Sequence, residues 1–569
     1  MPKSPDSLET LLAQLEEAKT RFGPEDGGRA EELLAALAGQ RFADAASLAR
    51  FHEAVLFLRA YPQSPAVLRL ADEILESFAQ RVEQLRSAGA DLGGLEEPDV
   101  SGIAGTGFSA VFSYPAVCLL AQRHAAEVSI DWEGHSKPER LGSTLPRFVP
   151  LLEDDALVEA NLPARAWLGA AAGGAGHELA WLLERLERLP LSLDEIGELY
   201  DSLELPIRWE LGNSTITRSR LRIQVPEIFY HEAPLRRRSE VSLEAELKAE
   251  PLPLRRVSRT EGRALVELAQ DTSAMRYREL YGFTYGDPAR MLKAAAGRGV
   301  EILVWGVPPE RRLPLRAYHA GLFFKNGTPI GYVEGLSLFE RMEVGFNIYY
   351  TFREGESAWL YAQTLRLFHQ VLGVTCFSVD PYQIGHHNQE AIQAGAFWFY
   401  RKLGFRPLEA ALARLVEHEE RKMRSTPGYR TPARTLRRLA EGSMIFEGPG
   451  ASPGDWDRFQ VRNLGFAVGR RMAERFAGDA GRMRRASLSD VGHALGIGPA
   501  RWKEAERRAF ENLSLVLGLI PDLAQWTETE KRALFEVIRA KAGGHESLYL
   551  WWQQQQPRLR AAVLKLGSR

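Results

Sequence analysis

The sequence predicts an α/β fold in which one mixed-sheet domain is embedded in a larger, mostly helical multidomain chain. Three observations lead to this prediction. The 569 residues exceed what one hydrophobic core normally organises. Helical spacing of apolar residues dominates both ends of the chain, whereas residues from about 255 to 410 alternate between helix and strand patterns. We therefore divide the chain into regions 1–91, 92–250, 251–425 and 426–569.

Composition limits the classes of function. Seventy-two basic and 74 acidic residues give a net charge of −2, so the charge of the whole chain does not favour nucleic acid as a partner. No window contains the roughly 20 apolar residues that a membrane span needs, and the first residues lack the apolar core of a secretory signal. The sequence therefore predicts a cytoplasmic protein without a membrane partner.

The pattern of possible metal ligands is sparse. Cys118 and Cys376 are the only cysteines and lie far apart, which gives no disulfide framework, zinc ligand set or redox pair. We expect two buried thiols and no bound metal. Asp131, Glu133 and His135 alternate as if on one strand face; a metal site is one interpretation, and a solvated face is the favoured one.

The first region is predicted to pack helix on helix. Apolar residues recur at spacings of three and four from Ser7 onward. The clearest helix is expected to begin at Ser64, which can cap it, with Pro65 at its first position and Gly89 just past its end. A short linker rich in Gly and acidic residues, 93–98, follows.

Region 92–250 is predicted to be a mixed α/β domain of unknown role. Ser192 and Glu195 form a capping box at the start of a helix. The alternation within residues 206–227 predicts two short strands joined at Gly212-Asn213. A basic run at residues 236–238 is interpreted as solvated, with an acidic partner as the alternative.

Region 251–425 has a regular succession of elements. Asn326-Gly327 is a strong hairpin signal because both residues tolerate positive φ. The expected order is a helix near 261–271, a strand from 301, two strands around the Asn-Gly turn, a strand within 341–352, a helix at 357–372, a strand at 374–380 and an aromatic-rich helix.

That last helix ends in a recognisable motif. Residues 388–405 read NQEAIQAGAFWFYRKLGF, with Asn388, Ala391, Tyr400 and a final Leu-Gly-Phe turn. This pattern resembles the fourth helix and following turn of the GNAT superfamily of N-acetyltransferases. Since the preceding order of elements is also that of the GNAT core, the resemblance covers about 255–410 and implies a GNAT-like mixed sheet.

The sequence departs from the family after Arg406. A GNAT core closes with another strand or two, whereas residues 408–423 have a helical pattern. The missing strands would have to come from elsewhere in the chain. Region 426–569 is predicted to be helical, with a structural helical hairpin turning at Gly496.

The resemblance implies a site for the pyrophosphate of acyl-CoA at a helix N-terminus, where unpaired N–H groups favour anions. The family loop runs Arg or Gln, two residues, Gly, one residue, then Gly or Ala. Arg353 and Ala358 fit its ends, but Glu356 stands where Gly is expected and Gly355 is displaced by one. Two interpretations stay open: the N–H groups around Ser357 bind the pyrophosphate, or the segment is a plain strand-to-helix turn.

The resemblance also implies catalytic roles. Tyr400 stands where several GNAT members carry the Tyr that protonates the leaving thiolate; aromatic packing is the alternative. Glu343, on the strand before the loop, is our first choice for the general base and Glu334, on the hairpin, is the second, with a solvated strand residue as the alternative for either. Asn388 resembles the family Asn that contacts the CoA arm, with a helix cap as the alternative.

These expectations define a function and a rival. The leading hypothesis is an N-acyltransferase that moves an acyl group from acetyl-CoA or another acyl-CoA directly to an amine-bearing acceptor, since the motif contains no cysteine. The rival is a catalytically degenerate GNAT fold that serves as a ligand-sensing or protein-interaction module.

His386 and His387 are interpreted as an exposed loop pair, with a base or metal role as the alternative, and His319 as a core or rim residue.

Overall fold

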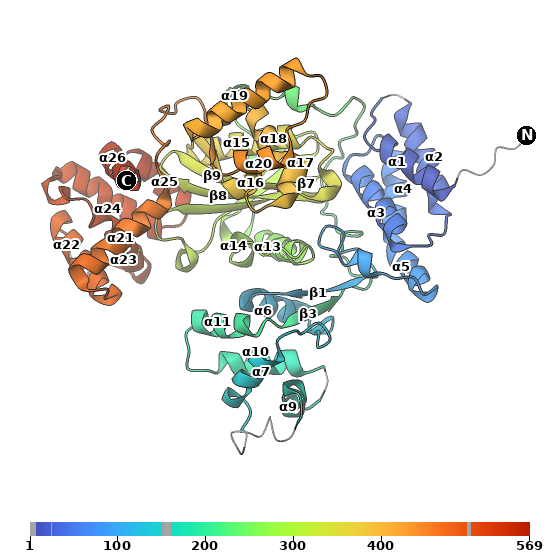
Figure 1. Ribbon diagram of the computed structural model, residues 1–569, viewed down its shortest axis with the longest axis horizontal. Helices are drawn as coiled ribbons and strands as arrows, with labels where there is room; N and C mark the ends of the chain where they lie inside the picture. Colours follow the sequence, from blue (N-terminus) through green and yellow to red (C-terminus); the bar gives the residue numbers. More distant parts are fainter. Residues whose placement is uncertain are drawn as a thin grey trace, which may run out of the picture.

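A computed structural model describes residues 7–23, 25–150, 152, 161–174, 176–497 and 502–568. Within these residues, nine strands form a mixed sheet at the centre of the molecule (Figure 1). The strand order is β11-β12-β10-β9-β8-β7-β6-β5-β4. The strands are β4 (Leu254–Arg256), β5 (Leu292–Gly297), β6 (Val300–Trp305), β7 (Ala317–Lys325), β8 (Thr328–Leu338), β9 (Arg341–Ile348), β10 (Cys376–Val379), β11 (Arg406–Pro407) and β12 (Met444–Glu447).

The predicted Asn-Gly hairpin joins β7 to β8 and is confirmed. Asn326 and Gly327 have φ values of 48° and 81°. Two left-handed residues give the turn a twist that matches the flanking strands, so Lys325 pairs with Thr328 and the ladder continues to Ala317 and Ser337. Asn326, at the tip of the hairpin, is buried. Its side-chain amide donates to the carbonyl of Ala60, at 2.9 Å.

β9 and β10 are parallel neighbours that pair over only part of their length. The register runs from Arg341 opposite Cys376 to Glu343 opposite Ser378. β9 continues to Ile348, but among the described residues none pairs with its last five on the β10 side. β10 ends at Val379, so the second half of β9 extends past it toward the start of α15.

The closing strands come from two places in the chain. β11 follows the Leu-Gly-Phe turn directly, and β12 lies after residue 425, inserted antiparallel between β10 and β11. The expectation that 426–569 is entirely helical is wrong at this point, and the sheet extends past the predicted boundary. Four residues, Met444–Glu447, are too few for their alternation to mark them as a strand.

Helices cover both faces of the sheet (Figure 1). α13 and α14 pack on one face, where Trp305 donates to the carbonyl of Gly282; α15 packs on the other, where Tyr361 contacts Phe346. The expected aromatic helix is two helices, because Gly395, at φ 66°, breaks it. These helices are α13 (Arg259–Ala274), α14 (Tyr281–Thr284), α15 (Ser357–Leu372), α16 (Pro381–Ile384), α17 (Gln389–Ala394), α18 (Ala396–Lys402), α19 (Ala410–Ser425) and α20 (Ala433–Leu439).

The N-terminal helices pack on one another and share a continuous apolar core with the large sheet. Ser64 caps the start of α4 as predicted. The helix expected to run on to Gly89 is broken at Ser77 into two. The helices are α1 (Leu8–Ala18), α2 (Asp26–Ala38), α3 (Ala45–Ala60), α4 (Pro65–Glu76) and α5 (Phe78–Ser87).

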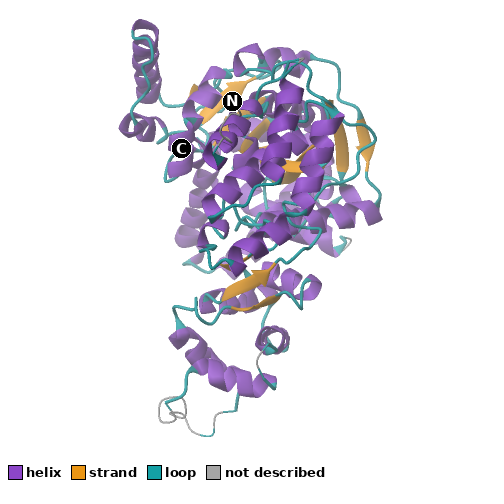
Figure 2. Ribbon diagram, turned by 90° about the vertical axis from the view of Figure 1, so that its right-hand side faces the viewer, coloured by secondary structure: helices purple, strands orange, loops and turns teal. Residues whose placement is uncertain are grey.

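A smaller unit projects from the body of the molecule and has a core of its own (Figure 2). Within the described residues its three strands have the order β1-β3-β2. The Ser192–Glu195 capping box is confirmed. The expected hairpin at Gly212-Asn213 is wrong, since β3 pairs with β1 and β2 instead. The elements are β1 (Gly107–Val111), α6 (Tyr114–Arg123), β2 (Val128–Ile130), α7 (Pro138–Thr144), α9 (Ala164–Ala172), α10 (Glu178–Glu187), α11 (Leu193–Leu203) and β3 (Pro206–Glu210).

The C-terminal helices form the opposite flank from the N-terminal ones (Figure 1). α25 packs directly on the sheet, where Tyr549 donates to the carbonyl of Leu315, at 2.7 Å. Gly496 ends α22 as expected, and residues 498–501 of the predicted hairpin turn lie outside the described part of the chain. Within that part, no helix is both long and apolar enough to span a bilayer. The helices of this flank are α21 (Val461–Phe476), α22 (Ala480–Leu495), α23 (Glu504–Leu517), α24 (Glu528–Ala542), α25 (Glu546–Gln554) and α26 (Pro557–Gly567). A further helix, α12 (Leu243–Lys248), precedes β4 and lies against α15, where Gln363 donates to Glu246.

Candidate functional site

A cavity of 260 Å³ opens beside the last residues of β9, beyond the end of β10. It brings together four residues predicted from the sequence: Arg353, Ser357, Asn388 and Tyr400. They come from the start of α15, the start of α17 and the middle of α18. The other lining residues are Arg278, Tyr332, Phe346, Asn347, Ile348, Tyr382, Gln383, Glu390, Ala391, Ala394, Ala396 and Phe399. We call this cavity the cleft.

The first residue of α15, Ser357, lines the cleft. Glu356 is the N-cap residue, and its side chain makes no capping hydrogen bond. The first N–H groups of an α-helix have no acceptor within the helix, and the helix dipole adds partial positive charge there. Since Ser357 lines the cleft and Ala358 follows it, this helix start can bind an anion.

The two glutamates of the loop do not line the cleft. Glu356 is buried beside Arg298, with 2.6 Å between Oε1 and Nη2, and lies 4.0 Å from the Lys325 ammonium. Glu354 is paired with Lys19 at 2.5 Å. Gly355 packs on Tyr61, since a Cβ at Gly355 would lie 2.5 Å from the Tyr61 hydroxyl oxygen. Gly355 and Glu356, both predicted as cofactor-binding residues, therefore do not line the cleft: Gly355 faces Tyr61, and Glu356 faces Arg298 and Lys325 of the large sheet.

A third carboxylate, missed in the sequence, does line the cleft. Glu390 accepts a hydrogen bond from Arg353 and lies 3.6 Å from Arg278. Burial would raise the pKa of Glu390, but the hydrogen bond and charge of Arg353, with the charge of Arg278, lower it below its ordinary value. Two guanidinium groups against one carboxylate leave the wall of the cleft with a net positive charge.

Tyr400 is held in the wall of the cleft by aromatic rings. It is 3% exposed, and its ring centroid lies 5.5 Å from that of Tyr361 and 5.6 Å from that of Phe405. Burial raises the pKa of Tyr400 well above its ordinary value. The phenol is therefore protonated at neutral pH, as a proton donor must be.

The two candidate bases occupy different surroundings. Glu343 is 3.5 Å from Arg316 and lines a separate cavity of 420 Å³. Glu334 lies two residues from Tyr332, so both project from the same face of β8, and it accepts a hydrogen bond from Tyr318. Burial raises the pKa of Glu334, which brings this carboxylate closer to the range useful for a base.

Asn388 caps a helix and lines the cleft, so the two sequence interpretations are compatible. Its Oδ1 accepts from the N–H of Ala391, at 3.1 Å, and its Nδ2 donates to the carbonyl of Tyr382, at 3.1 Å. These bonds use both ends of the amide and fix the loop between β10 and α17.

The histidines and acidic residues do not assemble into a metal site. His386 and His387 are exposed, as expected, and His319 is buried, with its pKa lowered to about 4 by burial. β2 ends at Ile130, so Asp131 and Glu133 lie in a turn rather than on a strand face. Among the described residues no group of three or more His, Cys, Asp or Glu is placed to hold a metal ion.

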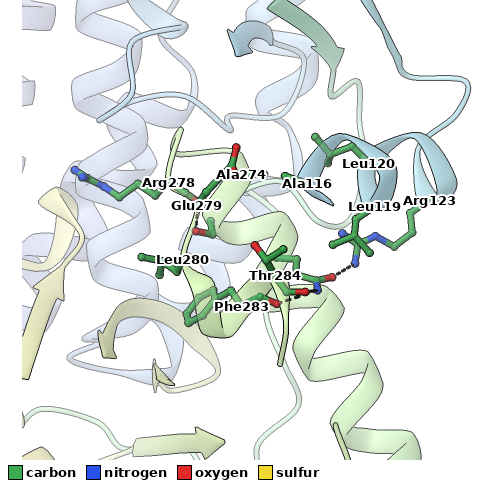
Figure 3. A pocket seen from close by; sticks show the side chains of 12 residues that line it. Ala116, Leu119, Leu120, Arg123, Ala274, Arg278, Glu279, Leu280, Phe283 and Thr284 are labelled. Atoms are coloured by element: carbon green, nitrogen blue, oxygen red, sulfur yellow. Dashed lines mark hydrogen bonds between the residues drawn. The ribbon is translucent and has the colours of Figure 1, made fainter. Parts of the chain in front are cut away.

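A second hollow, between α6 and the chain that follows α13, is too small for a substrate (Figure 3). Its volume is 20 Å³, which accommodates about one water molecule. Arg123 bridges it by donating to Gln270, at 2.8 Å, and to Asp271, at 2.7 Å. These bonds tie the smaller α/β unit to the face of the large sheet that α13 covers.

Comparisons of this chain with protein-family models, with curated proteins and with solved structures found no match. The geometry of the cleft and the resemblance of its motif therefore carry the functional argument.

Proposed function

We propose that the chain is a GNAT-like N-acyltransferase that uses an acyl-CoA to acylate an amine. The observation that carries the proposal is a cleft beyond the last β9–β10 pair, Glu343 and Ser378, lined by the end of β9, Tyr400 and the start of α15. The order of elements from α13 to α18 and the closing strands β11 and β12 agree with the resemblance.

In this proposal the start of α15 holds the pyrophosphate. The free N–H groups from Ser357 onward and the Arg353 guanidinium supply donors and positive charge. The thioester arm lies along the end of β9 that β10 does not cover, beside Asn347 and Asn388. Glu354 and Glu356 do not oppose the phosphates, because both are paired with cations away from the cleft.

The reaction is a direct transfer. The base removes a proton from the acceptor ammonium, and the amine lone pair attacks the thioester carbonyl carbon. A C–N bond forms and the C–S bond breaks; the departing thiolate takes the proton of the Tyr400 hydroxyl. The attacking nitrogen still carries one proton too many, and its transfer to the Tyr400 phenolate, directly or through solvent, gives the neutral amide and restores the phenol. Glu334 is our choice of base, since burial raises its pKa and it shares a face of β8 with Tyr332, which lines the cleft; Glu334 itself is not among the lining residues.

A thermal-shift titration with acetyl-CoA tests cosubstrate binding. A ligand that binds only the native state stabilises it by about 2.7 kcal/mol at 100 times its dissociation constant. We expect a shift for the wild type and a much smaller shift for Arg353→Ala. Arg434→Ala, at an exposed position on α20, is the matched control and should retain the shift. Absence of a shift with every acyl-CoA would overturn the proposal.

The Arg353–Glu390 pair is the observation that favours the rival, a degenerate GNAT fold that binds a ligand without transferring an acyl group. The Glu390 carboxylate already accepts from the Arg353 guanidinium, whose N–H donors the pyrophosphate would use. Thermal shift with acetyl-CoA and no transfer to any of a panel of amines is the result expected for this rival.

Glu390→Gln is expected to tighten acetyl-CoA binding about fivefold, because removing one like charge beside the pyrophosphate gains about 1 kcal/mol near a surface. Isothermal titration calorimetry measures the dissociation constant. Glu354→Gln is the control and should change it little, because Glu354 is paired with Lys19 outside the cleft. Weaker binding by Glu390→Gln would show instead that Glu390 positions Arg353.

A further inference from the structure

A larger cavity lies on the other side of α17 from the cleft. Its volume is 630 Å³, and the two cavities meet only at Ala394, which lines both. Its walls are α17, α18, α20 and the chain before α20. We call it the basic cavity, after the three cations that line it: Arg238, Lys402 and Arg430.

The charge of the basic cavity is not balanced by the protein. Within the part of the chain that the structure describes, no Asp or Glu lines this cavity and none of its three cations forms an ion pair. The nearby carboxylate of Glu419 is used elsewhere, since it accepts from Tyr429, at 2.8 Å, and from Lys422, at 3.1 Å. Cations held together without counter-charges attract anions.

The three cations come from distant parts of the sequence. Arg238 begins a short 3₁₀ helix, Lys402 ends α18 and Arg430 precedes α20. Burial and the charge of Arg238 lower the pKa of Lys402, so the two cations are close enough to interact. The backbone N–H of Arg236 donates to Glu356, at 3.0 Å, and so anchors the Arg238 segment to the start of α15.

The remaining lining residues of the basic cavity can contact the uncharged part of an organic ligand. Trp398, Ile392 and Leu436 give an apolar surface, and Gln389 and Gln393 add amide groups. The Trp398 indole donates to Thr431, at 3.1 Å, which fixes its ring. The volume falls within the roughly 300–1,000 Å³ of small-molecule sites.

We infer that the basic cavity binds a phosphorylated ligand of about nucleotide size, with phosphate at Arg238, Lys402 and Arg430 and the organic body against Trp398. This inference does not require acyl transfer. Two sources share the chemistry: the nucleotide end of the same acyl-CoA that the cleft is proposed to hold, or a separate phosphorylated molecule.

Calorimetry with adenosine 3′,5′-bisphosphate, and with adenosine as the uncharged comparison, tests the inference. We expect the bisphosphate to bind and adenosine not to bind. The double variant Arg238→Gln/Arg430→Gln should weaken bisphosphate binding by about 100-fold, roughly tenfold for each lost guanidinium. Arg434→Gln is the control, since Arg434 is exposed on α20 outside the cavity. Equal affinity of wild type and double variant, or no binding by the wild type, would overturn the inference.

Competition distinguishes the two sources. If the nucleotide end of CoA fills the cavity, saturating CoA abolishes bisphosphate binding, and the double variant weakens binding of CoA but not of pantetheine. If the ligand is separate, the bisphosphate binds equally well to the CoA-saturated protein. Arg353→Ala separates this inference from the proposed function, because it should impair CoA binding in the cleft and leave bisphosphate binding intact.

Discussion

Tyr400→Phe is expected to lower the rate of acyl transfer about 10²- to 10⁴-fold, the usual contribution of a positioned acid, while leaving acetyl-CoA affinity unchanged. The substitution removes only the hydroxyl of a residue that lines the cleft. The ring retains its contacts with Tyr361 and Phe405. Steady-state rates with an identified amine acceptor, together with calorimetry for acetyl-CoA, measure the two quantities.

Tyr361→Phe provides the matched control for this experiment. Tyr361 is also a buried phenol, it contacts Tyr400 edge to face, and it does not line the cleft. Its loss of a hydroxyl should leave the rate unchanged. An unaltered rate in Tyr400→Phe would remove this residue from the mechanism and leave aromatic packing as its role.

Glu53→Gln is expected to lower the free energy of unfolding by about 3–5 kcal/mol, because it leaves a buried guanidinium without its counter-charge. The Arg218 side chain is 2% exposed and lies 2.6 Å from Glu53. Thr351 donates to the same carboxylate oxygen, and the His52 ring lies 3.0 Å from the other. The pair therefore connects α3 to the segment after β3 and to the chain before α15.

Urea denaturation followed by circular dichroism measures this effect. The matched control is Glu244→Gln, which breaks an exposed pair with Lys248 and should cost less than about 1 kcal/mol. A comparable loss of unfolding free energy in Glu53→Gln and Glu244→Gln would contradict the assignment of Glu53 and Arg218 as a buried ion pair.

The same pair predicts a pH dependence. Burial would raise the pKa of Glu53, but the charge of Arg218 and hydrogen bonds from its neighbours lower it from 4.5 to about 2. A lowered pKa in the folded state contributes stability at pH values above 4.5, which is lost as pH falls toward about 2. The stability difference between wild type and Glu53→Gln should therefore shrink over that window.

Local signals in the sequence predicted a good part of the sheet. The Asn326-Gly327 turn depends only on residues that tolerate positive φ, and the capping box at Ser192 depends on two side chains three positions apart. Such features need no knowledge of tertiary contacts. β12 escaped prediction because four residues carry too little periodicity and their pairing with β10 is a long-range contact.

The candidate site was predictable only where a motif marked it. Tyr400, Asn388, Arg353 and Ser357 line one cleft, but the sequence could not give the direction of the Glu356 side chain, which depends on Arg298. Arg278, Glu390, Lys402 and Arg430 carry no local signal, and the basic run that contains Arg238 did not indicate a cavity. They lie on separate elements, and only the packing of those elements brings them together.

The origin of β12 beyond α19 and α20 has a practical consequence for dissecting the protein. A fragment that stops at residue 425 would lack the strand that pairs with β10 and would expose its N–H and C=O groups along an open margin. An exposed edge strand can pair with a strand of another chain, so this truncated fragment should self-associate. The smallest piece that completes the sheet must reach Glu447.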